Sequence, residues 1–238
     1  MAEPLRDWQG HAVVVGVGGI GGALITALRR QAPGLSVHGA GRRGRDLTLD
    51  SCDDASLEAF GQRLCQHHRP LRLVIYAAGV LHGGDLQPEK RIAQLRRSAL
   101  EQSFAVNAYG PALLARALEP CLEKGRPFHF ASLSARVGSI GDNRLGGWYA
   151  YRAAKAAQNQ LLHTLAVEWR RRWPLACVSL LHPGTTATEL SAPFRGGVAP
   201  ERLFSPDWAA EQLLTVLGRQ TPEQSGAFLA WDGQAIPW

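Results

Sequence analysis

The stretch HAVVVGVGGIGG, residues 11–22, decides the fold of this chain. Its first half is an apolar run without polar alternation, which predicts a strand buried on both faces of a sheet. The glycines that follow permit a tight turn and let backbone amides approach a ligand closely. The helical pattern that begins in this turn would offer unpaired N–H groups and a positive dipole end to a pyrophosphate. Strand, glycine turn and helix in this order indicate a dinucleotide site, with a turn that holds no ligand as the alternative.

Apolar runs and helical patterns alternate along the rest of the chain. Parallel strands need long crossovers, so this order predicts an α/β doubly wound parallel sheet of about seven strands with helices on both faces. No internal repeat or linker divides the sequence, which indicates a single domain over residues 1–238. The expected strands are 11–16, 35–40, 47–50, 71–77, 126–132, 175–181 and 227–231. The expected helices are 19–30, 54–66, 89–98, 101–124, 148–173 and 207–218.

The composition is that of an ordinary globular protein, with 45% hydrophobic and 19% charged residues. The four cysteines stand singly and form no CxxC, so we expect neither a metal site nor a redox pair, in a reduced, cytoplasmic setting. The first residues, MAEPLRDW, include acids and no long apolar run, unlike a signal peptide. No apolar segment approaches the roughly 20 residues that span a bilayer, so no membrane association is expected.

The net charge of +6 comes almost wholly from arginine, because the chain has 23 arginines and only three lysines. The basic clusters are spread along the chain and lack interleaved aromatics, so nucleic-acid binding is not expected. They are either solvated faces or a site for an anion such as phosphate. The second expected strand ends at HGAGRR, residues 38–43. An NAD site places an acid near this point, whereas Arg42 and Arg43 suit a 2′-phosphate, which favours NADP(H) over NAD(H) unless both are simply solvated.

The stretch WYAYRAAK, residues 148–155, contains two tyrosines and one lysine. Residues four apart share one face of a helix, which pairs Tyr151 with Lys155, whereas Tyr149 has Ala153 at that spacing. A nearby ammonium lowers the pKa of a phenol towards neutral pH. A tyrosine tuned in this way can give a proton to a carbonyl oxygen or take one from an alcohol. The plain alternative is an exposed helical pair without chemistry.

With this pair, the sequence resembles the short-chain dehydrogenase/reductase family, whose YxxxK motif matches YRAAK at 151–155. Further family motifs follow in order along nearly the whole chain. AAG at 77–79 is similar to NAAG, with Tyr76 in place of the asparagine, and PGTTAT at 183–188 is similar to PGxxxT. Asn107 and Asp50 match the family's helix asparagine and its adenine-binding acid. SARVGSIGDN at 134–143 and the ending WDGQAIPW resemble the C-factor-like, carbonyl-reductase-like branch.

The resemblance implies a Rossmann-type domain that reduces a small-molecule aldehyde or ketone to an alcohol with NADPH. Tyr151 is then the general acid, Lys155 lowers its pKa and holds the cofactor ribose, Ser134 binds the substrate oxygen, and Asn107 anchors a water. Residues 185–206 form a substrate lid, and the protein is a homodimer or homotetramer. No metal is expected. The positions implied to hold the cofactor are Gly16, Gly18, Gly19, Ile20, Gly21, Arg42, Arg43, Asp50, Ala77, Ala78, Gly79, Asn107, Tyr151, Lys155, Pro183, Gly184, Thr186 and Thr188.

Three departures from the family pattern define a second hypothesis. The glycine turn is one residue shorter than usual, and Ala154 replaces the usual serine before the lysine. The catalytic serine normally precedes a glycine by three residues, which is Ala135 counted back from Gly138. Ser134 lies one residue before that position, and Ser132 lies beyond it. We assign the role to Ser134, because the long loop before Tyr151 can absorb a shift of one residue. The alternative is an NADP(H)-binding signalling or regulatory protein with little turnover.

Overall fold

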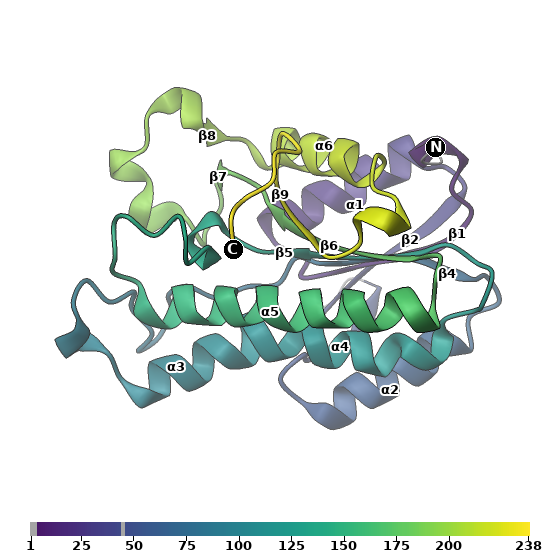
Figure 1. Ribbon diagram of the computed structural model, residues 1–238, viewed down its shortest axis with the longest axis horizontal. Helices are drawn as coiled ribbons and strands as arrows, with labels where there is room; N and C mark the ends of the chain where they lie inside the picture. Colours follow the sequence, from purple (N-terminus) through teal and green to yellow (C-terminus); the bar gives the residue numbers. More distant parts are fainter. Residues whose placement is uncertain (1–3, 44–45) are drawn as a thin grey trace.

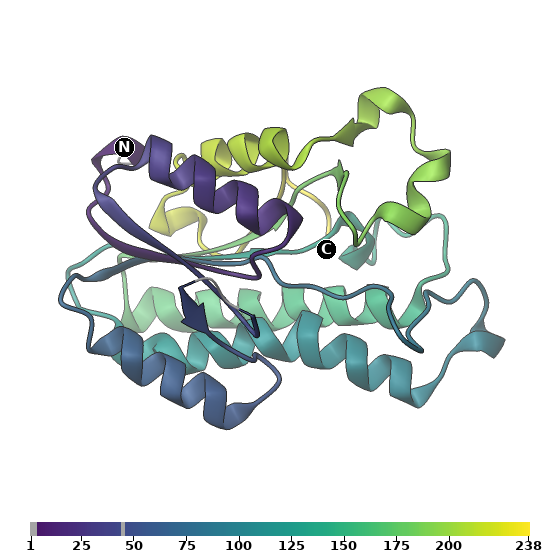
Figure 2. The same ribbon diagram turned by 180° about the vertical axis from the view of Figure 1, so that it is seen from behind.

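A computed structural model describes residues 4–43 and 46–238, so residues 1–3 and 44–45 of the expected domain lie outside the described part. Its parallel sheet has seven strands in the order β3-β2-β1-β4-β5-β6-β9, which confirms the expected doubly wound fold. Helices cover both faces (Figures 1 and 2). The strands are β1 Gly10–Val15, β2 Leu35–Gly41, β3 Leu47–Thr48, β4 Leu71–Tyr76, β5 Phe128–Leu133, β6 Ala176–His182 and β9 Ala227–Ala230. The helices are α1 Gly19–Gln31, α2 Asp54–Cys65, α3 Arg97–Phe104, α4 Gly110–Leu118, α5 Tyr149–Arg172 and α6 Pro206–Leu217.

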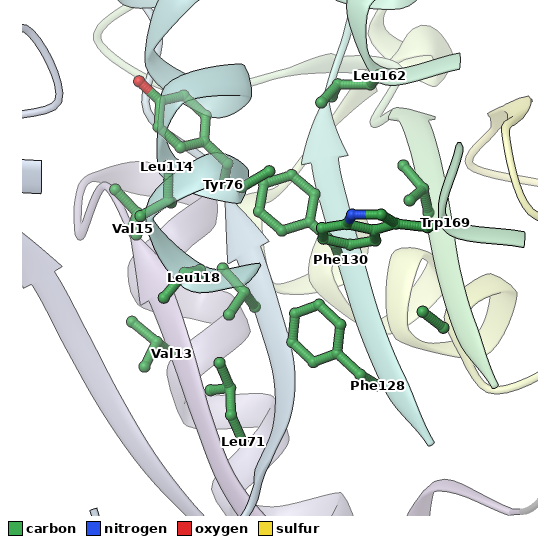
Figure 3. Packing of buried hydrophobic residues seen from close by; sticks show 14 of the residues in the cluster. Val13, Val15, Leu71, Tyr76, Leu114, Leu118, Phe128, Phe130, Leu162 and Trp169 are labelled. Atoms are coloured by element: carbon green, nitrogen blue, oxygen red, sulfur yellow. The ribbon is translucent and has the colours of Figure 1, made fainter. Parts of the chain in front are cut away.

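Strand β1 explains why the first apolar run lacks polar alternation. Val13 and Val15 pack on the face covered by α2, α4 and α5, while Ala12 and Val14 pack on the face covered by α1 and α6. The first of these cores contains the largest buried side chain, Trp169 of α5, beside two phenylalanines of β5 (Figure 3). An apolar core on each face packs the sheet against both helix layers. This packing holds the carboxyl ends of the strands in place.

The strand order reverses at β1, which pairs with β2 on one side and β4 on the other. Chain connections leave β1 and β4 in opposite directions at this point, which makes it the topological switch point of the sheet. The residues that follow the carboxyl ends of these two strands are the glycine turn and the AAG motif. Ligands of open α/β sheets bind at such a point, and the topology therefore supports the placement that the sequence predicted.

The segment between β4 and α3 differs from expectation. The predicted helix 89–98 is wrong, because only a 3-10 turn at Ile92–Gln94 forms before α3. The reason is tertiary: the Glu89 backbone oxygen accepts a hydrogen bond from Trp148 N, and its carboxylate accepts one from Ala150 N. The predicted helix 101–124 begins earlier, contains a π-helical turn at Ala105–Tyr109 and ends in a 3-10 turn at Glu119–Cys121.

The sequence also missed a small parallel pair of strands, β7 Thr185–Thr186 and β8 Leu203–Phe204. It brackets two 3-10 segments, Ala192–Gly197 and Pro200–Arg202, which project beyond one end of the main sheet (Figure 1). Three further 3-10 turns complete the described elements, and none belongs to the sheet. They are Leu5–Asp7, Arg136–Gly138 and Pro222–Gln224.

The expectation that all cysteines are reduced and unpaired is wrong for two of them. Cys65 ends α2 and Cys121 ends the 3-10 turn after α4, with Cα atoms 4.6 Å apart and sulfurs in a disulfide. The partners are 56 residues apart in the chain, so only the packing of α2 against α4 brings them together. Cys52 and Cys177 are free thiols. None of the helices among the described residues has the length and apolar character that crossing a membrane requires.

Candidate active site

Two glycines of the turn after β1, Gly16 and Gly21, are packed too closely for a side chain. Gly16 has φ +91°, and its N–H donates to the Ala40 carbonyl over 2.8 Å. A Cβ atom on Gly16 would lie 2.5 Å from Ala78 N, and one on Gly21 would lie 1.7 Å from the Gly16 oxygen. The turn ends at Gly18, the N-cap of α1, which offers no side chain to the first amides of the helix. These amides are available to an anionic group, as the predicted binding of a dinucleotide pyrophosphate requires.

The cofactor segments predicted from separate parts of the sequence meet at this turn. A Cβ on Gly19 would lie 2.5 Å from Thr188 Cγ2, so the segment after β6 reaches the start of α1. Gly79 lies beside the Asn107 side chain and Leu190 in the same way. Pro183 and Gly184 follow β6, and Thr186 is buried in β7. Ala77 lies next to Gly21.

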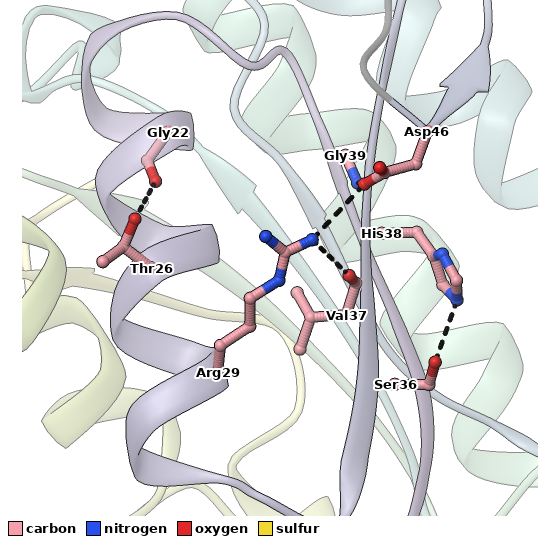
Figure 4. A network of polar contacts seen from close by, with 8 residues as sticks. All are labelled: Gly22, Thr26, Arg29, Ser36, Val37, His38, Gly39 and Asp46. Atoms are coloured by element: carbon pink, nitrogen blue, oxygen red, sulfur yellow. Dashed lines mark hydrogen bonds and ion pairs between the residues drawn. The ribbon is translucent and has the colours of Figure 1, made fainter.

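The end of β2 carries Arg42 and Arg43, and both side chains are exposed. An acid that sequence reasoning missed lies beside them. Asp46 accepts a hydrogen bond of 2.7 Å from Gly39 N and pairs with Arg29 at 3.5 Å (Figure 4). Its carboxylate is therefore engaged within the protein.

Asp50 follows β3, and its Oδ1 accepts a hydrogen bond of 3.0 Å from Cys52 N. Tyr76, which replaces the family's asparagine, has a structural use: its hydroxyl donates to the Val106 carbonyl over 2.9 Å and contacts Ser51 Oγ at the same distance. The phenol thus ties β4 to the π-helical turn that carries Asn107.

Asn107 is fully buried within the π-helical turn. Its amide oxygen accepts from Val80 N at 3.0 Å, and its amide nitrogen donates to the Val80 oxygen at 2.8 Å and to Ser103 Oγ at 3.2 Å. The side chain therefore holds the loop after the AAG motif against the helix. Its binding of a water stays a prediction.

Tyr151 and Lys155 lie on the buried face of α5, with Lys155 Nζ 5.8 Å from the centre of the Tyr151 ring. Tyr149 is 38% exposed, so the tyrosine that the i,i+4 spacing pairs with Lys155 is the buried one. Burial raises the pKa of Tyr151 above its ordinary value and lowers the pKa of Lys155 to about 7. In the free protein burial thus opposes the lowering of the phenol pKa that the sequence suggested.

The Lys155 amine donates to the Leu133 carbonyl over 2.8 Å and to Gln158 Oε1 over 2.9 Å. The Gln158 amide nitrogen in turn donates to Ser132 Oγ over 2.6 Å. Sequence reasoning missed Gln158. A polar residue at i+3 from the lysine, on the buried face of a helix, is the signal that could have found it.

The three positions considered for the catalytic serine, two serines and Ala135, have different environments. Ser134 is 4% exposed and donates a hydrogen bond of 2.6 Å to Asn159 Oδ1, while Ser132 accepts one from Gln158. Ala135 has an extended backbone and caps the 3-10 turn Arg136–Gly138. Gly138 packs directly on α5, since a Cβ there would lie 2.9 Å from Lys155 Cβ.

Aromatic side chains from three loops gather beside Tyr151. Trp148 contacts the Tyr151 ring at a centroid distance of 6.3 Å and the Phe194 ring at 4.9 Å. The His82 ring also contacts the Phe194 ring, with a distance of 5.8 Å between the ring centroids. Phe194 belongs to residues 185–206, so the expected lid segment contacts Trp148, which in turn contacts Tyr151.

A family model described as enoyl-(acyl carrier protein) reductase, one of the short-chain dehydrogenase models, matches residues 26–233. The chain belongs to the short-chain dehydrogenase/reductase family. The matched span begins inside α1, after the shortened glycine turn. Membership makes the protein an NAD(P)-dependent oxidoreductase.

Two curated relatives of this short-chain dehydrogenase/reductase are similar over most of their own lengths. The 1-hydroxy-2-glutathionyl-2-methyl-3-butene dehydrogenase of Rhodococcus sp. (strain AD45) is 31% identical over 80% of this chain and 78% of its own. The C-signal protein of Myxococcus xanthus is 33% identical over 58% of this chain and 78% of its own. Among solved structures, the NADPH-bound carbonyl reductase from chicken fatty liver superposes with a TM-score of 0.80, at 24% identity, over 97% of this chain and 99% of that one.

The residues of this short-chain dehydrogenase/reductase fit a nicotinamide dinucleotide. Gly16 and Gly21 leave no room for a side chain, the first amides of α1 have no side-chain cap, and Thr188 contacts the turn at Gly19. These features would receive the pyrophosphate. Tyr151 and Lys155 lie at the carboxyl edge of the sheet, where the Lys155 amine donates to the Leu133 carbonyl at the end of β5.

Proposed function

We propose that the protein reduces an aldehyde or ketone to an alcohol with NADPH, and that Tyr151 is the general acid. The observation that carries the proposal is the pairing of Tyr151 with Lys155 on the buried face of α5, with Nζ 5.8 Å from the phenol ring. A tyrosine and a lysine that form only a surface pair on a helix would be exposed to solvent. The contacts of Trp148 with both Tyr151 and Phe194 of the expected lid segment support a substrate site there.

When bound, NADPH supplies a hydride to the carbonyl carbon. Tyr151 donates its phenolic proton to the carbonyl oxygen, which becomes the alcohol. The charged Lys155 amine stabilises the phenolate that remains and thereby opposes the effect of burial on the Tyr151 pKa. Ser134 is proposed to hold the substrate oxygen, and Asn107 to anchor a water that returns a proton to Lys155. Oxidation of the alcohol runs through the same groups in reverse.

Cofactor selection is proposed to rest on Arg42 and Arg43, whose exposed guanidinium groups follow β2 directly. Arginine binds phosphate through several N–H donors, so a 2′-phosphate is preferred over a hydroxyl. The engagement of Asp46 by Arg29 and the Gly39 amide supports this choice, because an acid already paired is less free to bind a ribose.

The protein is further proposed to work as a homodimer or homotetramer. Helix α5 exposes Leu161 and Val167, each at 41%, and Tyr109 at the start of α4 is 50% exposed. Apolar side chains on one helix layer favour burial against another copy. Sedimentation equilibrium measures the mass, and a monomer at micromolar concentration would contradict this part.

Tyr151→Phe tests the proposed reaction. The variant loses one hydroxyl, so folding and NADPH affinity should persist while turnover falls by about 10²–10⁴-fold, the usual contribution of general acid catalysis. Tyr149→Phe is the matched control and should keep most activity, because Tyr149 lies partly in solvent. Both are assayed on whichever aldehyde, ketone or quinone of a panel the wild type reduces. Wild-type turnover by Tyr151→Phe would overturn the mechanism.

A second candidate is an NADP(H)-binding regulatory protein with little turnover. The observation that favours it is the commitment of the Ser134 hydroxyl to Asn159, while Ala135 stands three residues before Gly138, the glycine packed on Lys155. The Ser134 hydroxyl then has no proton to give to a substrate oxygen. Tight NADPH binding without reduction of any carbonyl in the panel would favour this candidate.

A further inference from the structure

A chain of buried polar groups leads from β5 to the lysine of the active site. Gln158 and Ser132 are both fully buried, and Lys155 is 3% exposed. The Gln158 side chain lies between the other two, bonded to Ser132 Oγ at 2.6 Å and to Lys155 Nζ at 2.9 Å. Gln158 occupies a position on α5 where the apolar core would otherwise continue, and burial of an amide is costly unless its groups are hydrogen-bonded.

The orientation of the Gln158 amide is fixed by its neighbours. Its nitrogen has two acceptors on β5, Ser132 Oγ at 2.6 Å and the Leu133 oxygen at 3.3 Å. A rotated amide would turn its oxygen towards the Leu133 carbonyl and its nitrogen towards the Lys155 amine, which are both repulsive when the amine is charged. The amide oxygen therefore faces Lys155.

This oxygen is one of two neutral acceptors that hold the amine, the other being the Leu133 carbonyl. Burial lowers the pKa of Lys155 to about 7, and among the described residues no carboxylate counteracts it. The charge on the amine at neutral pH is thus sensitive to each dipole that points at it. Loss of one acceptor would favour the neutral amine.

We propose that Gln158 is a positioning residue, which keeps the Lys155 amine charged and in place beside Tyr151 through an amide whose orientation Ser132 sets. The inference rests on the proposed function for its consequence in turnover, but the hydrogen bonds concern the folded protein alone. It also gives Ser132 a role through the lysine, distinct from the contact with substrate proposed for Ser134.

The direct test follows Lys155 by NMR. The chain has only three lysines, and Lys90 and Lys124 are exposed, so ¹³Cε-labelled lysine gives few signals, which Lys155→Met assigns. Gln158→Met keeps length and volume but loses all three side-chain hydrogen bonds, so the titration midpoint of Lys155 should fall by about one pH unit or more. Gln158→Glu places a carboxylate there and should raise the midpoint.

Gln160→Met is the matched control, because Gln160 is an exposed glutamine on the same helix that bonds only to Thr164. It should leave the midpoint unchanged. Ser132→Ala keeps Gln158 but frees its amide, and should lower the midpoint in the same direction as Gln158→Met. This variant tests the proposal even if changes at Gln158 itself prevent folding.

Turnover gives the second readout. With the midpoint lowered by one unit, the charged fraction of the amine at pH 7 falls from about half to about a tenth, so kcat should drop roughly fivefold and recover at lower pH. KM for the carbonyl should change little. An unmoved Lys155 midpoint in Gln158→Met, Gln158→Glu and Ser132→Ala overturns the proposal. If the Lys155 midpoint moves as expected but the wild-type protein reduces no carbonyl, the role of Gln158 stands. The proposed function is then contradicted instead.

Discussion

The Ser134 hydroxyl donates a hydrogen bond of 2.6 Å to the amide oxygen of Asn159, two helical turns beyond Tyr151 on α5. In this arrangement the serine has no proton left for a substrate oxygen. The amide nitrogen of Asn159 is buried and, within the described residues, has no partner. A rotation of the Asn159 amide would let that nitrogen donate to Ser134 Oγ and would release the hydroxyl proton towards a substrate.

Ser134→Ala should therefore lower kcat/KM for the carbonyl by about 10-fold or more, the effect of losing one hydrogen bond to a developing charge. NADPH affinity should not change, because the proposed partner of Ser134 is the substrate. Steady-state kinetics and cofactor titration measure the two effects. A silent Ser134→Ala together with a crippled Ser132→Ala would show that the substrate serine has been misassigned.

The exposed arginines after β2 predict the cofactor preference. Arg42→Ala and Arg43→Ala should each weaken NADPH binding by about 10- to 100-fold, because a hydrogen bond to a charged group is worth roughly 1.5–3 kcal/mol. NADH binding should be unchanged. Arg30→Ala is a suitable control, since Arg30 lies in the last turn of α1 and pairs with Glu211 of α6. Fluorescence titration with both cofactors decides, and equal affinities of the wild type for NADPH and NADH would refute the arginine argument.

Trp148 is the only residue other than glycine with positive φ among the described residues, at +53°. The left-handed conformation costs a residue with a Cβ about 1–2 kcal/mol. Trp148→Gly should therefore be more stable than Trp148→Ala by about 1 kcal/mol, although both lose the same indole. Urea unfolding measures the difference. Both variants should also lose kcat/KM for aromatic carbonyls more than for short aliphatic aldehydes, because Trp148 lies against Tyr151 and Phe194.

The disulfide between Cys65 and Cys121 closes a segment of 56 residues. Loop-closure entropy predicts a contribution of about 4 kcal/mol to stability for a loop of this length. Reductant should lower the urea midpoint of the wild type and leave a Cys65→Ser/Cys121→Ser variant unaffected. A thiol titration of the denatured, unreduced protein should find two of the four cysteines. Four reactive thiols would mean that the bond does not form.

Stability should fall with acid through a histidine cluster at the start of β1. His11 is fully buried and stacks on His67 at 4.1 Å, with His38, His68 and Arg69 also near. Burial first, and these neighbours second, lower the pKa of His11 to about 4 from 6.5. The unfolded chain therefore binds the proton first, so stability is present above pH 6.5 and is lost as pH falls towards 4.

The loss from His11 is at most about 3 kcal/mol, since each pKa unit corresponds to about 1.4 kcal/mol. His11→Phe keeps an aromatic ring on His67 but cannot titrate. Urea unfolding at pH 7.5 and pH 4.5 should show a smaller loss for this variant than for the wild type. Equal losses would place the acid sensitivity elsewhere.

The parts of the protein that the sequence predicted well are those with local causes. The apolar run before Gly16 and the turn that follows depend on neighbouring residues, and the i,i+4 spacing of Tyr151 and Lys155 is a property of any helix. The helix expected at 89–98 failed because its backbone is held by α5, where Glu89 accepts hydrogen bonds from Trp148 and Ala150. A distant element therefore overrode local propensity.

The sequence by itself thus determined the fold class, the glycine turn and the tyrosine–lysine pair, since periodicity and spacing act within one element. Only the tertiary structure decided that Cys65 meets Cys121, that Ser134 is held by Asn159, and that Gln158 is bonded to Ser132. Each of these contacts joins residues from different segments of the fold. Packing of α5 on β5 and of α2 on α4 selects those partners, and no pattern along the chain encodes it locally.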